Sequence, residues 1–254
     1  MRRSLLAHPD YGPLPALLLI LTAVTGVVDA FSILSLGRVF VANMTGNVVF
    51  AGFALVGAPG FSLSASLFAL AGFLAGAAFG GTLITRSAGD RGTLLRAGVA
   101  AELLFAAVAL IIAASSGAPG LSHGTLAITG GAFGPAVMDA LAALLAVATG
   151  IQNAVARKLA VPDMTTTVLT MTLTGIGADL RAVLRGNSRA AARTALDRRL
   201  LSIATMLAGA VAGASLALRV SPLAALTLGT ALLAVAAAGA ALAAKKSAAL
   251  AAKK

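Results

Sequence analysis

The sequence contains no cysteine and no tryptophan, and it has one tyrosine and two histidines among its 254 residues. A chain without cysteine forms no disulfide and no thiolate metal site. The histidines, His8 and His123, are far apart in the sequence and do not suggest a shared metal ion. We therefore expect the protein to bind no metal and to need no cofactor.

Charged residues are also scarce, because they make up 11% of the chain whereas apolar residues make up 59%. The mean hydropathy is +0.98. A soluble domain needs about a quarter of its residues to be charged in order to cover its surface. Apolar runs of about 20 residues instead match the hydrocarbon thickness of a bilayer. The composition predicts an all-α integral membrane protein with the lipid bilayer as a partner.

Acidic residues are few, with 8 Asp and Glu against 19 Lys and Arg, and the net charge is +11. In a soluble protein this balance would indicate a nucleic-acid partner. Here the basic residues lie between apolar segments, where such residues set the orientation of membrane proteins. We therefore expect no nucleic-acid partner. The sequence also lacks a P-loop and a nucleophile paired with a base, so it does not predict an enzyme.

Six apolar segments are long enough to be full spans: 14–36, 62–85, 97–115, 135–156, 199–218 and 222–244. Two further stretches, 39–57 and 164–180, are apolar but contain several Asn or Thr residues. Either of these could cross the bilayer as a helix, or it could enter and return as a broken or re-entrant segment.

The distribution of Lys and Arg favours six full spans. With six spans and a cytoplasmic N-terminus, only Arg38 and Arg219 lie outside. If both ambiguous stretches also crossed, the outside would gain a further set of basic residues: Arg86, Arg91, Arg96, Arg157 and Lys158. Because Lys and Arg collect on the cytoplasmic side, we expect 39–57 to enter from outside and 164–180 from inside. Both termini and a basic loop at about 181–199 are then cytoplasmic.

The single membrane domain, 1–254, contains an internal repeat. The sequence TGVVDA at 25–30 resembles TGIQNA at 149–154. Each copy is followed by an apolar stretch that contains several Asn or Thr residues. Repeat one covers about 14–115 and repeat two about 135–244. Three spans in each repeat make the second copy insert upside down, an arrangement that secondary transporters use together with discontinuous helices.

Polar side chains at membrane depth are the candidate site residues. Asp29 is an acid inside the first span, where a charge is costly and usually functional, and we interpret it as a proton or cation acceptor. The other candidates for a solute or ion path are amide and hydroxyl residues: Asn43, Thr45, Asn47, Gln152, Asn153, Thr170 and Thr172. Gly46 and Gly175 would allow the helices to unwind there. Alternatively, these groups bond to neighbouring backbone or join helices.

Glu102 is a second acid within a predicted span. It follows Arg96 closely, so we expect its side chain to extend to the cytoplasmic surface or to pair with that arginine.

The motifs GVVDA at 26–30, FVANMTGN at 40–47 and GIQNA at 150–154 resemble those of the YoaK-like family, and the resemblance covers nearly the whole chain. That family comprises bacterial inner-membrane proteins of unknown function. The resemblance implies an inner-membrane location and a similar number of spans, and it implies no substrate. Met171 departs from the pattern, because the resemblance leads us to expect glycine there.

Two functional hypotheses follow. The first is a secondary transporter or channel-like permease for a small solute or ion. The alternative is a non-transporting membrane scaffold or a subunit of a larger complex, and a homo-oligomer is compatible with both. A shared hydrated cavity around Asp29 would favour transport, whereas hydrogen bonds that saturate these groups in a dry core would favour the scaffold.

Overall fold

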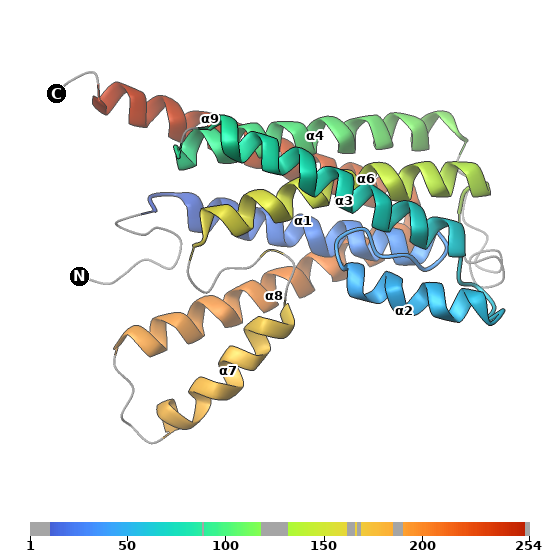
Figure 1. Cartoon of the computed structure of the whole chain (residues 1–254), viewed down its shortest axis with the longest axis horizontal. Coiled ribbons are helices and arrows are strands. Elements are labelled where there is room, and N and C mark those ends of the chain that lie inside the picture. The colour runs from blue at the N-terminus through green and yellow to red at the C-terminus, as the bar shows by residue number, and fades with distance from the viewer. Residues whose placement is uncertain are drawn as a thin grey trace.

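The structure is a computed structural model that describes residues 11–87, 89–117, 132–161, 166, 169–184 and 190–251. His8, His123 and residues 185–189 of the basic segment lie outside these ranges. The described residues form helices only (Figure 1): α1 Leu14–Ser35, α2 Met44–Leu55, α3 Leu63–Arg86, α4 Arg91–Ser115, α6 Pro135–Leu159, α7 Leu169–Leu184, α8 Ala190–Arg219 and α9 Pro222–Ala251.

Six of these helices are long and apolar enough to cross a membrane, so the predicted number of full spans is confirmed. They are α1, α3, α4, α6, α8 and α9. Two helix limits differ from the limits of the segments expected from the sequence. Helix α4 begins at Arg91 rather than at 97, because Asp90 accepts hydrogen bonds from the amides of Gly92 and Thr93 and caps it. The segment 181–199 is no simple loop, because α7 extends to Leu184 and α8 begins at Ala190.

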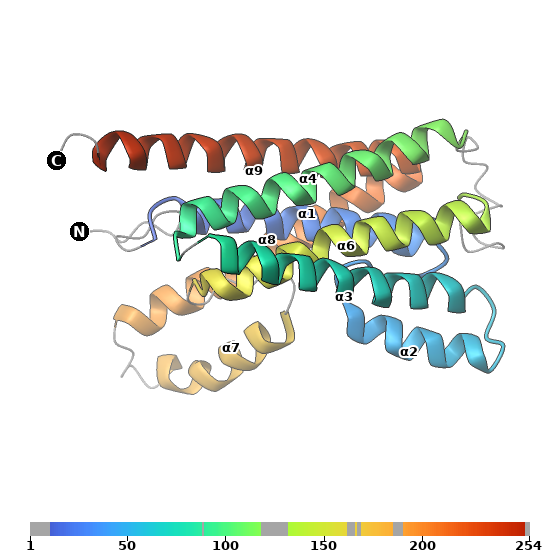
Figure 2. The ribbon, with the colours of Figure 1, turned by 45° about the horizontal axis from the view of Figure 1, so that its top comes forward.

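The long helices run in alternating directions through one bundle (Figures 1 and 2). Helices α1, α4 and α8 start at the end that carries most basic residues, and α3, α6 and α9 finish there. This basic end contains Arg86, Arg91, Arg157 and Lys158 at helix termini. The opposite end contains Arg38, just beyond α1, and Arg219, the last residue of α8.

Helices α2 and α7 are shorter than a full span. At about 1.5 Å per residue, the 12 residues of α2 extend about 18 Å and the 16 residues of α7 about 24 Å, against a hydrocarbon core of about 30 Å. Helix α2 starts in the middle of the molecule, packs against α3 and ends at the opposite end. Helix α7 starts in the middle, packs against α8 and ends at the basic end (Figure 1).

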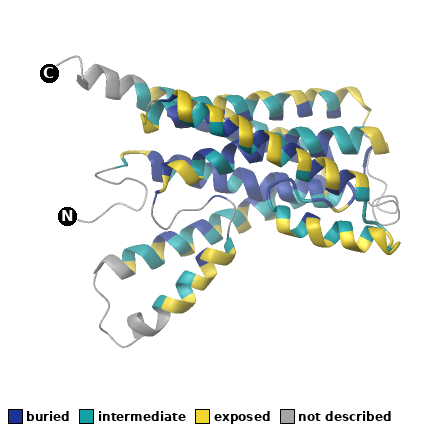
Figure 3. Cartoon of the chain, viewed as in Figure 1, coloured by how far each residue is buried: buried dark blue, intermediate teal, exposed yellow. Residues whose placement is uncertain are grey.

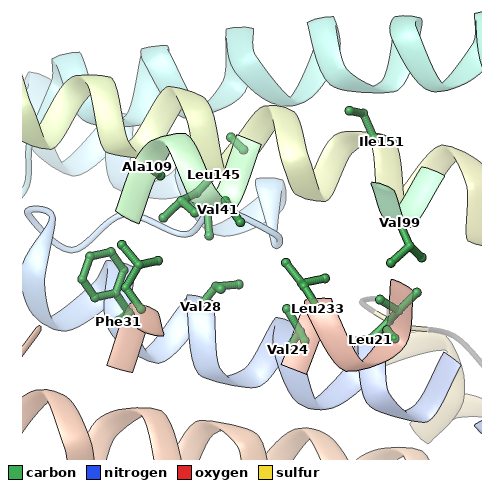
Figure 4. Packing of buried hydrophobic residues seen from close by; sticks show 14 of the residues in the cluster. Leu21, Val24, Val28, Phe31, Val41, Val99, Ala109, Leu145, Ile151 and Leu233 are labelled. Atoms are coloured by element: carbon green, nitrogen blue, oxygen red, sulfur yellow. The ribbon is translucent and has the colours of Figure 1, made fainter. Parts of the chain in front are cut away.

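Four helices form the core, in which α1 contacts α6 and α9, and α4 contacts the same two helices. Their interior is apolar: Val24 and Phe31 of α1, Leu145 and Ile151 of α6 and Leu233 of α9 are all at most 1% exposed (Figure 4). Helix α3 packs on the outside of α6, and α8 packs on the outside of α1. As a result of this packing, α1 is largely buried, whereas α2 and α8 expose much of their surface (Figure 3).

Glycines allow α1 and α8 to approach closely. A Cβ atom at Gly26 would collide with the backbone of Met206 and Ala210, and one at Gly209 would collide with the backbone of Ala23. A Cβ atom at Gly213 would lie 2.8 Å from the carbonyl oxygen of Val27. Such close backbone contact is a common means of helix association in lipid.

The same kind of contact joins α3 and α6. A Cβ atom at Gly150 would collide with the backbone of Phe73 and Ala77, and one at Gly76 would collide with the backbone of Val147. A Cβ atom at Gly80 would lie 2.7 Å from the Cβ of Ala154. The two tightest helix pairs therefore each join the first half of the chain to the second.

Candidate functional site

The most unusual backbone in the core lies at residues 36–43, which join α1 to α2 and which we call the crossover peptide. It is not helical, and it leads back from the opposite end of the bundle to the middle, where α2 begins. Leu36, Val39 and Val41 are fully buried. Irregular backbone at membrane depth is stable only where protein or water satisfies its amide and carbonyl groups.

Asp29 of α1 satisfies two of these amides. Its Oδ1 atom accepts hydrogen bonds from the backbone N–H groups of Val41, at 3.2 Å, and Ala42, at 3.0 Å. The side-chain amide of Asn43 donates to Oδ2. Asp29 is 6% exposed, so this carboxylate is enclosed by the peptide that it binds.

Asn47 and Thr149 satisfy the adjacent groups. The Oδ1 atom of Asn47 accepts from the N–H of Phe40 at 2.8 Å, and its Nδ2 atom donates to the carbonyl of the same residue at 2.6 Å. The hydroxyl of Thr149 donates to the carbonyl of Val41. The crossover peptide is therefore held by side chains from three helices: α1, α2 and α6.

Gln152 and Asn153 lie on α6, one turn from Thr149. The Nε2 atom of Gln152 donates to the hydroxyl of Thr25 on α1 at 3.0 Å, whereas its Oε1 atom is buried without a partner among the described residues. Asn153 donates to the carbonyl of Thr149 in its own helix at 2.9 Å. Gln152 thus joins α6 to α1 through the hydroxyl of Thr25.

The remaining candidates lie elsewhere. Thr45 is exposed near the start of α2. Thr170 and Thr172 belong to α7, which lies toward the other end of the bundle from α2 (Figures 1 and 2). Thr172 is buried, and the carbonyl of Thr170 accepts a hydrogen bond from Thr174 within the helix. The structure therefore brings together Asp29, Asn43 and Asn47 but does not join them to the threonines of α7.

Gly46 and Gly175, the expected helix-break positions, lie within helices in this structure, Gly46 in α2 and Gly175 in α7. Both glycines instead make room for a large side chain. A Cβ at Gly46 would collide with the ring of Phe40, and one at Gly175 would lie 2.7 Å from the guanidinium carbon of Arg199. Arg199 in turn forms an ion pair of 2.6 Å with Asp179.

An aromatic cluster covers the crossover peptide at the opposite end of the bundle. Phe40 stacks on Phe50 with ring centroids 5.6 Å apart, and Phe61 lies 5.1 Å from Phe50 and 5.3 Å from Phe53. The guanidinium of Arg38 lies 5.3 Å from the Phe61 centroid. Sequence reasoning missed this cluster, although four of the ten phenylalanines fall between residues 40 and 61.

Asp29 and Asn47, which hold the crossover peptide, are both buried. An apolar groove of about 460 Å³ lies between α1, α8 and α9, lined among others by Ala23, Val27 and Thr205, and none of the candidate residues lines it. What the crossover site offers chemically is an enclosed carboxylate that accepts three N–H hydrogen bonds. A negative charge strengthens such bonds, so its protonation state controls how firmly the crossover peptide is held.

Six apolar spans and a buried crossover peptide define a multi-pass α-helical membrane protein. The chain belongs to the family described as "Protein of unknown function (DUF1275)", whose model matches residues 17–239. It is similar to UPF0700 transmembrane protein YoaK of Bacillus subtilis (strain 168), at 34% identity over 164 residues, which cover 65% of this chain and 66% of that protein. No solved structure matches the chain. The resemblance to the YoaK-like family is thus confirmed.

Proposed function

We propose that the protein is a secondary transporter or channel-like permease for a small solute or ion. The observation that carries the proposal is the crossover peptide, a stretch of non-helical backbone at membrane depth that is attached to an enclosed acid. Transporters of several folds place their substrate and coupling-ion sites at such discontinuous helices. A purely structural span does not require a break of this kind.

We also propose that the chain consists of two inverted repeats, in which α1, α2, α3 and α4 correspond to α6, α7, α8 and α9. The packing supports this correspondence. The contact of α1 with α8 corresponds to that of α6 with α3, and the contact of α2 with α3 corresponds to that of α7 with α8. In this scheme α2 and α7 are re-entrant segments from opposite sides, and α1 and α6 lie at the centre.

The glycine contacts support the same scheme at the level of single residues. Gly26 meets the backbone of Met206 and Ala210, and its sequence counterpart Gly150 meets that of Phe73 and Ala77. Each glycine occupies the same place in its copy of the TG motif. These matching contacts support the proposal of a duplicated unit whose copies pack against each other.

Asp29 is the proposed proton or cation acceptor, and its hydrogen bonds suggest how it acts. As a carboxylate it holds the amides of Val41 and Ala42. Neutralisation by a proton weakens these bonds, because charge-assisted hydrogen bonds are about twice as strong as neutral ones. The crossover peptide is then free to move and to open a path past Asn43 and Asn47. The proposed orientation places the basic end and both termini in the cytoplasm of a bacterial inner membrane.

A non-transporting scaffold or complex subunit is the second candidate, and one observation favours it. Both oxygens of Asp29 and both polar atoms of the Asn47 side chain already bond to the crossover region. Residues whose role is only to form hydrogen bonds with buried backbone groups do not require a water-filled path beside them. In this case, the polar groups stabilise the fold and no solute binds.

Flux measurements on protein reconstituted in lipid vesicles test the proposal. The first probe is proton uptake, reported by a pH-sensitive dye trapped in the vesicles and driven by an imposed membrane potential. The second is thermal stabilisation by sodium, potassium, sugars, amino acids and organic acids. A solute present at 100 times its dissociation constant adds about 2.7 kcal/mol to the free energy of unfolding.

The matched variants are Asp29→Asn and Asp139→Asn. Asp139 is partly exposed on α6, and it accepts a hydrogen bond from Ser64 away from the crossover peptide. We expect wild type and Asp139→Asn to show proton flux or solute stabilisation that Asp29→Asn loses. Wild-type protein that shows neither response would favour the scaffold, and an unchanged Asp29→Asn variant would remove Asp29 from the mechanism.

A further inference from the structure

A second acid, Glu102, is enclosed in the middle of α4 and takes no part in the crossover site. Its side chain is 1% exposed, and its Oε2 atom has no hydrogen-bond partner among the described residues. The expectation that it extends to the cytoplasmic surface is wrong. Because α4 begins at Arg91, Glu102 lies about three turns inside the helix rather than one.

Glu102 faces the interior of the four-helix core. It belongs to the buried face of α4, between Val99 and Ala106, and this helix contacts both α6 and α9. Figure 4 shows Val99 of α4 in the core cluster that also includes Leu21 of α1 and Leu233 of α9. The next buried position after Val99 is that of the glutamate. An ionisable group therefore points into a mostly apolar interior.

The packing of α4 against α6 places Glu102 at the level of Gln152. A Cβ atom at Gly98 would lie 2.8 Å from the Cγ2 atom of Val155, so these residues face each other. The two helices run in opposite directions (Figure 1), and one turn further brings Glu102 level with Ile151 and Gln152. Gln152 is 2% exposed, and its Oε1 atom also has no partner among the described residues.

Two buried acceptor oxygens without a donor among the described residues thus lie at one level of the core. A buried acceptor without a donor is unfavourable, and an ionised carboxylate in mid-membrane is more so. A protonated carboxyl group removes both problems, because it is neutral and has one O–H donor. Ca²⁺ or Mg²⁺ would require about six oxygen ligands, and the adjoining buried residues Val99, Ala106 and Ile151 have only apolar side chains.

We propose that Glu102 is a proton-binding site in the core, with the Oε1 atom of Gln152 as the acceptor of its hydrogen bond. Gln152 connects this site to Thr25 of α1, four residues before Asp29. The proton site is separate from the crossover peptide. The evidence for the proton site is the burial of Glu102 and Gln152, and this evidence does not depend on the transport proposal.

Few other titratable groups face Glu102 from the helices that pack against α4. Those on α3 and α6 lie near helix ends: Arg86, Asp139, Arg157 and Lys158. Among its described side chains, α9 has no charged group, since its lysines begin at Lys245. On α4 itself, Arg91 and Arg96 lie toward the basic end. Asp29 lies across the core on α1 and is held by the crossover peptide.

Infrared spectroscopy of the full chain in lipid nanodiscs tests the proposal. The carboxylic-acid C=O stretching band of the wild type is expected to persist across the neutral pH range, and Glu102→Gln should remove it. Asp139→Asn, which alters a partly exposed acid, serves as the control and should leave the band in place. The proposal is overturned if no such band exists at neutral pH, or if Glu102→Gln leaves the band unchanged.

A second variant tests the hydrogen bond and does not depend on the folding of Glu102→Gln. Gln152→Leu removes the acceptor but keeps the acid, so the Glu102 band should remain and move to the higher frequency of a carboxyl group without a hydrogen bond. An unshifted band would overturn the assignment of Gln152 as acceptor. Thermal unfolding adds a further check, because Glu102→Gln resembles the protonated acid and should unfold at the wild-type temperature or above. A large decrease would indicate that the ionised form is native and would refute the proposal.

Discussion

Replacement of Asn47 by leucine removes the side chain that satisfies both backbone groups of Phe40. Asn47 is fully buried, so water cannot take its place. Each buried backbone group left without a partner costs about 1–3 kcal/mol. The two groups together give about 2–6 kcal/mol, and we expect the lower part of this range because hydrogen bonds between membrane helices average about 0.6 kcal/mol in double-mutant cycles.

The loss should appear first as local opening of the crossover peptide. The chain has no cysteine, so a single cysteine introduced by Val41→Cys reports on this segment. Val41 is fully buried, and a thiol reagent reaches it only when the segment opens. A loss of about 2 kcal/mol in local stability raises the open population, and hence the labelling rate, by about 30-fold.

The matched control is Thr22→Val in the same Val41→Cys background. The hydroxyl of Thr22 is buried too, but it bonds to the carbonyl of Leu18 in its own helix at 2.8 Å. Its loss leaves no irregular backbone group without a partner, so we expect little change in the labelling rate. Equal labelling rates in Asn47→Leu and Thr22→Val would refute the reasoning, because the hydrogen bonds of Asn47 would then not hold the crossover peptide.

Three further predictions concern packing, capping and topology. Gly209→Leu should separate α8 from α1 and reduce the yield of folded protein severely, whereas Gly52→Leu, at a glycine with open space, should be tolerated in the same detergent-solubility assay. Hydrogen bonds from the side chain and backbone of Thr93 lower the pKa of Asp90. The cap therefore stabilises the fold above the ordinary pKa of aspartate and is lost as pH falls through the lower folded value. At neutral pH, Asp90→Ala should cost about 1 kcal/mol in chemical unfolding. A cysteine at Pro59 should react with an impermeant reagent added outside cells, and labelling only from the cytoplasm would contradict the proposed orientation.

The spans were predictable because a bilayer imposes a length and a composition that a sequence displays directly. The same rule located Asp29, Asn43 and Asn47 as polar residues in apolar surroundings. It could not predict their partners, since these are backbone groups of Phe40, Val41 and Ala42, and backbone groups are the same in every sequence.

Two other features were visible in the sequence, as a repeated threonine and a capping aspartate, but the apolar pattern alone does not reveal their roles. Thr149 repeats Thr25 in the TG motif, yet its bond to the crossover peptide depends on a three-dimensional contact between α6 and residue 41. The depth of Glu102 was misjudged because Arg96 suggested the membrane boundary. The capping residue Asp90 marks the true start of the helix, two turns earlier than the apolar pattern suggests.

The bond from Thr149 to the crossover peptide spans 108 positions in the chain. During synthesis, α1, the crossover peptide and α2 enter the membrane long before α6 exists. Until then the carbonyl of Val41 lacks its donor, and α1 lacks the glycine-lined surface of α8. The first half of the protein therefore depends on the second half for one of its buried hydrogen bonds and for its closest helix contact. A chain truncated before α6 would lack this hydrogen bond and the α8 contact, so we expect it to be less stable in the membrane than the full chain.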